Sequence, residues 1–142
     1  MKYRIILFVH SLLICLLQLI PNTIISATWA GGPDKIIYNR YSFFWDIQIW
    51  GMGEPWYPLI SFFSLLTLCF AVIMLIRDSK WSKIAILASS VPQILLTLIP
   101  IFFMVRNMNT FSIVIVLMFI LMISEFVFSV ISVAKGFKST AQ

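Results

Sequence analysis

Residues 110–134 read TFSIVIVLMFILMISEFVFSVISVA, and this stretch decides the fold. Its only charged residue is Glu125. A helix needs about 20 mainly apolar residues to cross the hydrocarbon core of a bilayer, which is roughly 30 Å thick. Backbone N–H and C=O groups in lipid must be paired within the protein, and a helix pairs them locally. The stretch therefore predicts a membrane-spanning α-helix.

Three further stretches have the same character, and we expect them to span the membrane at residues 5–20, 58–76 and 84–105. Together with residues 110–134 they predict an all-α membrane protein, a bundle of four transmembrane helices in a single integral membrane domain (1–142). The composition agrees, since 61% of the 142 residues are hydrophobic and 11% are charged. Soluble domains carry about 25% charged residues, and a chain this short cannot bury so much apolar surface. These numbers exclude an ordinary soluble enzyme and a nucleic-acid-binding module.

The first stretch has a second interpretation. A basic start, an apolar run and the small residues Ser26 and Ala27 also resemble a secretory signal peptide with its cleavage site. Cleavage would leave three spans. We favour an uncleaved first span, because its apolar run slightly exceeds a usual signal core and two isoleucines follow Pro21.

The charges outside the spans predict the orientation. One set of segments carries basic residues and a single acid: Lys2, Arg4, Arg77, Asp78, Lys80, Lys83, Lys135 and Lys138. The opposite segments balance Lys35, Arg40 and Arg106 against Asp34, Asp46 and Glu54. Positive charge marks the cytoplasmic side of a membrane protein. We therefore expect both termini in the cytoplasm of a bacterial cell and the protein in its plasma membrane.

Residues 21–57 form the long extracytoplasmic loop of this topology. Gly31-Gly32-Pro33-Asp34 is a strong turn signal. From Tyr41 to Ile49, apolar and polar residues nearly alternate, which is typical of a half-buried strand. We expect a short β-hairpin cap in which Lys35–Tyr38 pairs with Phe43–Ile49. An amphipathic helix on the membrane surface is the alternative, because part of this segment also matches helical spacing.

The same loop is rich in aromatic residues, and it holds four of the five tryptophans: Trp29, Trp45, Trp50 and Trp56. Such rings anchor a protein at the level of the lipid headgroups. They also dominate binding hot spots. Contact with lipid is the simpler interpretation, and contact with a protein partner is the alternative.

One resemblance supports the topology. The order Trp29, Gly31-Gly32-Pro33, Tyr41-Ser42-Phe43-Phe44, Gly51 and Pro58, set between two spans, resembles a group of small, uncharacterised four-span bacterial membrane proteins. The resemblance covers about residues 15–76. It implies the four-span layout and no activity.

Polar residues inside the spans are candidate functional residues, because placing them in lipid is costly. Glu125 is the only acid in the spans, Gln93 lies at a similar depth by helical rise, and His10 lies nearer the cytoplasmic side. Three roles are open for Glu125: a protonated carboxyl group bonded to Gln93 or a serine, so that the third and fourth spans are held together; a cation or proton site; or a contact to a partner subunit. We favour the first.

No metal site, cofactor or catalytic group is expected. Cys15, Cys69, His10 and Glu125 lack the ligand spacing of a metal site within one helix, and His10 has no acid in its own helix to orient it. The sequence favours a non-enzymatic accessory, interaction or immunity-type membrane protein. Its partners would be the bilayer and a membrane protein or a second copy of the chain, with no nucleic acid. A small oligomeric transporter or channel component that uses Glu125 is the alternative.

Overall fold

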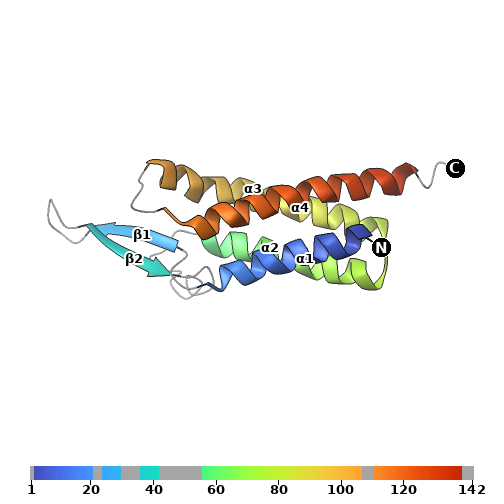
Figure 1. Cartoon of the computed structure of the whole chain (residues 1–142), viewed down its shortest axis with the longest axis horizontal. Coiled ribbons are helices and arrows are strands. Elements are labelled where there is room, and N and C mark those ends of the chain that lie inside the picture. The colour runs from blue at the N-terminus through green and yellow to red at the C-terminus, as the bar shows by residue number, and fades with distance from the viewer. Residues whose placement is uncertain (1, 21–23, 30–35, 42–55, 107–110, 139–142) are drawn as a thin grey trace.

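The structure is a computed structural model that describes residues 2–20, 24–29, 36–41, 56–106 and 111–138. Four helices account for most of these residues: α1 (Lys2–Gln18), α2 (Trp56–Ile76), α3 (Lys80–Arg106) and α4 (Ile113–Lys138). Two strands, β1 (Ile24–Trp29) and β2 (Ile36–Tyr41), lie between α1 and α2 in the chain. The helices form a bundle, and the strands project from one end of it (Figure 1).

Consecutive helices run in opposite directions (Figure 1). α1 packs against α2 and α4, and α3 packs against the same two helices. The four helices therefore form a closed ring, in which the first and last helices are neighbours. The N- and C-termini lie at one end of the bundle, which we call the terminal end, and the strands lie at the other (Figure 1).

Three helical segments among the described residues are long and apolar enough to cross a membrane: Trp56–Ile76, Lys80–Arg106 and Ile113–Lys135. This is the pattern of a multi-pass membrane protein. α1 has 17 residues, which at 1.5 Å per residue gives about 26 Å and falls short of the roughly 30 Å hydrocarbon core. The structure thus contains the expected four-helix bundle but supports three of the four expected spans.

The interior of the bundle contains many polar side chains beside its apolar ones, and the outside is apolar. Large apolar side chains such as Phe62, Leu95 and Phe102 are exposed along its length. The buried polar or charged residues are Ser11, Gln18, Ser61, Ser64, Thr67, Ser82, Ser89, Ser90, Gln93, Thr97, Ser112, Glu125, Ser129 and Ser132. Water-soluble proteins bury apolar residues and expose charged ones. The reversed arrangement suits a bundle whose surroundings are lipid, where small and polar residues line helix contacts.

Two apolar clusters enclose much of this polar interior. One cluster includes Leu7, Ala71, Met74 and Ile86, which lie in the halves of α1, α2 and α3 nearer the terminal end. The other cluster, toward the strands, consists of Ile14, Tyr57, Ile60, Met104, Ile115, Met118 and Met122. The polar side chains between them are therefore shielded toward both ends of the bundle.

The strand pairing among the described residues differs from the expected one. β1 pairs with β2 in an antiparallel sheet in which Ile24 lies opposite Tyr41 and Trp29 opposite Ile36. Residues 36–38 thus pair with residues 27–29, whereas the expected partner, 43–49, lies outside the described residues. The sequence contains the signal for the observed pairing, since β-branched residues flank both sides of the turn signal at residues 31–34. The alternation in residues 41–49 led us to expect the partner strand after β2 in the chain, whereas β1 precedes it.

The register predicts a specific disulfide. In a chain whose native Cys15 and Cys69 are replaced by alanine, Ser26→Cys with Asn39→Cys should oxidise readily, because directly opposed residues bring their Cβ atoms to about 5 Å. Thr28→Cys with Asn39→Cys is the control, because this pair is displaced by two residues from the register. Non-reducing electrophoresis after mild oxidation measures both. Equal or faster cross-linking of the displaced pair would overturn the register.

Candidate functional site

Glu125 lies in the interior of the bundle with none of its surface exposed. Its carboxyl group faces α1, where the Ser11 hydroxyl donates a hydrogen bond to Oε1. The Ser11 hydroxyl also lies 2.9 Å from the carbonyl oxygen of Leu7, one turn back on the same helix. Glu125 therefore links α4 to α1. The expected link from Glu125 to α3, through Gln93 or a serine, is wrong for the described residues, because the serine that bonds Glu125 lies on α1 and Gln93 bonds Ser64.

A second hydrogen bond lies beside the first. His10 Nδ1 donates to the carbonyl oxygen of Ile6 at 2.8 Å, which leaves Nε2 of a neutral ring free to accept from the Ser124 hydroxyl at 3.1 Å. The imidazole also packs edge-to-face on Phe128, with ring centroids 5.6 Å apart. Two adjacent residues of α1 therefore bond two adjacent residues of α4. We call His10, Ser11, Ser124 and Glu125 the α1–α4 clasp.

Gln93 belongs to a different group, which joins α1, α2 and α3. The side-chain amides of Gln18 and Gln93 each donate to Ser64 Oγ at 2.6 Å. Ser64 in turn donates to the carbonyl oxygen of Ile60 at 2.8 Å. A hydroxyl group offers one hydrogen and two lone pairs, so Ser64 is fully satisfied. We call Gln18, Ser64 and Gln93 the glutamine junction.

The remaining contacts complete the ring. Thr67 on α2 donates to Ser89 on α3, with the two hydroxyl oxygens 2.8 Å apart. Thr97 on α3 lies 3.3 Å from the sulfur of Met122 on α4. With the clasp and the junction, all four neighbouring helix pairs are joined by at least one side-chain hydrogen bond between buried residues. These bonds act where water is absent and where helix association depends on close packing and on hydrogen bonds between helices.

Four buried side-chain oxygens have no hydrogen-bond partner among the described residues: Gln18 Oε1, Ser61 Oγ, Gln93 Oε1 and Glu125 Oε2. Two of them belong to the glutamine junction and one to the α1–α4 clasp. A buried acceptor without a donor costs free energy. These oxygens are therefore the positions in the interior with capacity for a further donor or a small ligand.

The structure describes the candidate tryptophans unequally. Trp56 begins α2 and packs, half-buried, against the apolar cluster near the strands. Trp29 lies in β1, where the backbone alone is described. Trp45 and Trp50 lie outside the described residues. The partner interpretation of these aromatic residues therefore stays a prediction.

In the part of the chain that the structure describes, no group of three His, Cys, Asp or Glu side chains could hold a metal ion. Cys15 is buried and Cys69 is exposed, and both are free thiols. The structure brings His10 to Ser124, beside Glu125, which the sequence did not predict. It separates Gln93 from Glu125, which the sequence placed at a similar depth.

Several interior residues escaped the sequence analysis, notably Ser11, Gln18 and Ser64. Their spacing along each helix could have indicated that they share one face. Ser11 and Gln18 are seven residues apart, which places them on one face of α1 two turns apart. Ser61 and Ser64 repeat with a spacing of three on α2. Serine alone is a weak signal, because its hydroxyl can bond within its own helix.

Comparison with known proteins identifies no family for this chain: no family model matches it, and neither a curated protein nor a solved structure matches it significantly.

The glutamine junction predicts a difference between two similar serines. Ser61 and Ser64 are one turn apart on α2, and each is 1% exposed. Ser64→Ala should lower the free energy of unfolding by about 1–3 kcal/mol, because it leaves two buried amide groups without an acceptor. Ser61→Ala is the matched control and should stay near wild type, since its hydroxyl has no partner among the described residues. Unfolding by sodium dodecyl sulfate in mixed micelles measures both, and equal effects would contradict the assignment.

Proposed function

We propose that this protein is a non-enzymatic, multi-pass membrane protein of the accessory, interaction or immunity type. In this proposal the helices form a stable anchor in the bilayer. The extramembrane segment that contains β1 and β2 contacts a membrane protein partner or an external ligand. The observation that carries the proposal is the closed set of side-chain hydrogen bonds joining all four neighbouring helix pairs.

The position of Glu125 supports a structural role. Its side chain is 0% exposed, so it does not reach the surface where a partner subunit would present a basic residue. Ser11 has one hydroxyl hydrogen and two neighbouring acceptors, Leu7 O and Glu125 Oε1. In this proposal the carboxyl group is neutral and donates from Oε1 to Ser11, which replaces the donation from Ser11 to Oε1 and leaves the Ser11 hydrogen for Leu7 O. Glutamine at this position can donate in the same way.

The perimeter of the bundle supports the interaction part of the proposal. Exposed leucine, isoleucine, valine and phenylalanine side chains cover the helices, and such a surface packs equally well against lipid chains or the helices of a partner. Both termini then lie in the cytoplasm of a bacterial cell and the strands outside it. α1 remains part of the mature protein in this proposal, because Ser11 and Gln18 supply bonds to α4 and α2.

A small transporter or channel component is the second candidate. The four unpartnered buried oxygens favour it, because oxygen atoms without donors line the sites at which membrane proteins hold protons or cations. Glu125 would be the titrating group of such a path. The two candidates therefore differ in whether the carboxyl chemistry of Glu125 is required.

The substitution Glu125→Gln tests this difference. We expect the wild-type protein, reconstituted in liposomes, to carry no more proton, sodium or potassium flux than protein-free vesicles. We also expect Glu125→Gln to remain folded and to keep the same associated protein in native mass spectrometry, because an amide preserves the hydrogen bond to Ser11. An internal fluorescent pH indicator and ion-selective dyes measure the fluxes.

The control is Glu125→Leu, which removes hydrogen bonding and should lower stability. Ion flux through the wild-type protein that disappears in a folded Glu125→Gln variant would overturn the accessory function and establish transport. Loss of partner association in Glu125→Gln, with folding intact, would also contradict a purely structural role.

A further inference from the structure

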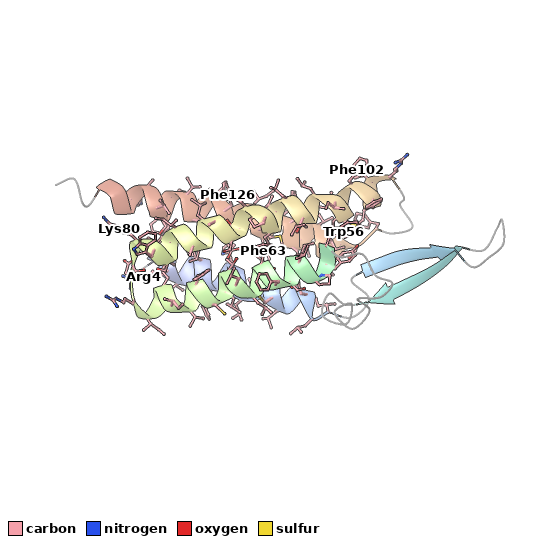
Figure 2. The ribbon with its side chains drawn as sticks, turned by 180° about the vertical axis from the view of Figure 1, so that it is seen from behind. Arg4, Trp56, Phe63, Lys80, Phe102 and Phe126 are labelled. Carbon is pink, nitrogen blue, oxygen red and sulfur yellow. The ribbon has the colours of Figure 1, made fainter. Side chains whose placement is uncertain are left out.

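The terminal end of the bundle carries an excess of positive charge. Six basic side chains are described there: Lys2, Arg4, Arg77, Lys80, Lys83 and Lys135. Asp78 is the only acid described at this end. Figure 2 shows Arg4 and Lys80 at this end and Trp56 and Phe102 toward the opposite end. Among the basic side chains that the structure describes, Arg106 alone lies outside this group.

Internal ion pairs occupy two of these cations. Arg4 lies 2.5 Å from one carboxylate oxygen of Asp78, and Lys83 lies 2.7 Å from the other. The hydrogen bond from Lys83, with the Arg4 guanidinium beside it, holds the pKa of Asp78 below its usual range. Asp78 therefore stays ionised at neutral pH and is shared between two bases. Arg77 and Lys80, which flank this short turn, are exposed and have no acidic partner among the described residues.

Two apolar side chains project beside these free cations. Ile76, the last residue of α2, is 82% exposed, and Trp81, in the first turn of α3, is 81% exposed. Leaving a tryptophan and an isoleucine in water would be unfavourable. At a membrane interface, a tryptophan ring sits at headgroup level and an adjacent aliphatic side chain reaches the acyl chains. Both side chains continue the apolar perimeter of the bundle into the basic end.

We propose that the α2–α3 turn binds anionic phospholipid headgroups. Arg77 and Lys80 contact the phosphate groups, the Trp81 ring lies at headgroup level, and Ile76 reaches the upper parts of the acyl chains. The ion pairs of Asp78 with Arg4 and Lys83 fix the turn and neutralise the one acid that would repel a phosphate. The partner is an anionic lipid because cations and membrane-depth apolar groups occur side by side, which a soluble phosphate compound would not require.

Lipid binding by the α2–α3 turn does not depend on the proposed function, since it would anchor an accessory protein and a transporter alike. The test uses the full-length protein in mixed micelles, with phosphatidylglycerol titrated against phosphatidylcholine and bound lipid counted by native mass spectrometry. The wild-type protein should retain phosphatidylglycerol in preference to phosphatidylcholine. Arg77→Gln should weaken phosphatidylglycerol retention about fivefold, and Arg77→Gln with Lys80→Gln about 25-fold, at roughly one fivefold step per cation near an anionic surface.

Arg106→Gln is the matched control, because it removes one exposed arginine from the far end of α3. It should leave phosphatidylglycerol retention unchanged. Equal loss in Arg77→Gln and Arg106→Gln, or equal retention of both lipids by the wild-type protein, would overturn the proposal. Displacement of the bound lipid by millimolar inorganic phosphate would also overturn it, because the turn would then recognise a free anion.

Discussion

The structure depends on one constraint: in lipid, a buried polar side chain finds its partner within the protein, on its own helix or on a neighbouring one, because no water is present. Burial of apolar surface cannot drive these helices together, because lipid chains are as apolar as the side chains they replace. Side-chain hydrogen bonds between helices therefore add to close packing in holding the bundle together. Each of the four neighbouring helix pairs has at least one, and the α1–α4 clasp closes the ring between the first and last helices.

The same constraint explains where apolar, polar and charged side chains lie in the bundle. Apolar side chains cover the outside of the bundle, and two apolar clusters enclose much of the polar interior. Most of the charged side chains that the structure describes lie at the terminal end, where Asp78 is held between Arg4 and Lys83. Glu125 thus lies in an interior that is shielded from the charged end by Leu7, Met74 and their neighbours.

Helix existence was predictable from the sequence, because long apolar runs have no other stable form in lipid. α2, α3 and α4 lie close to their expected positions, and α3 continues through Pro92 and Pro100. Helix partners were not predictable. Equal depth suggested that Gln93 meets Glu125, but depth leaves the rotation of each helix undetermined, and Gln93 bonds Ser64 instead. His10 and Ser11 meet residues 114 positions away, a distance that no local pattern encodes. The predicted strand partner differed from the observed one for a local reason. The alternation of residues 41–49 was the stronger strand signal, so the β-branched residues of β1 were not considered as the partner of β2.

A double-mutant cycle between Ser11 and Glu125 tests the central claim that these interior bonds hold the helices together. Ser11→Ala, Glu125→Met and their combination are unfolded with sodium dodecyl sulfate in mixed micelles, and the coupling free energy is taken from the four transitions. Contacting side chains that share a hydrogen bond in a membrane should couple by about 0.6 kcal/mol or more. Additive effects of the two substitutions, with no coupling, would contradict the account.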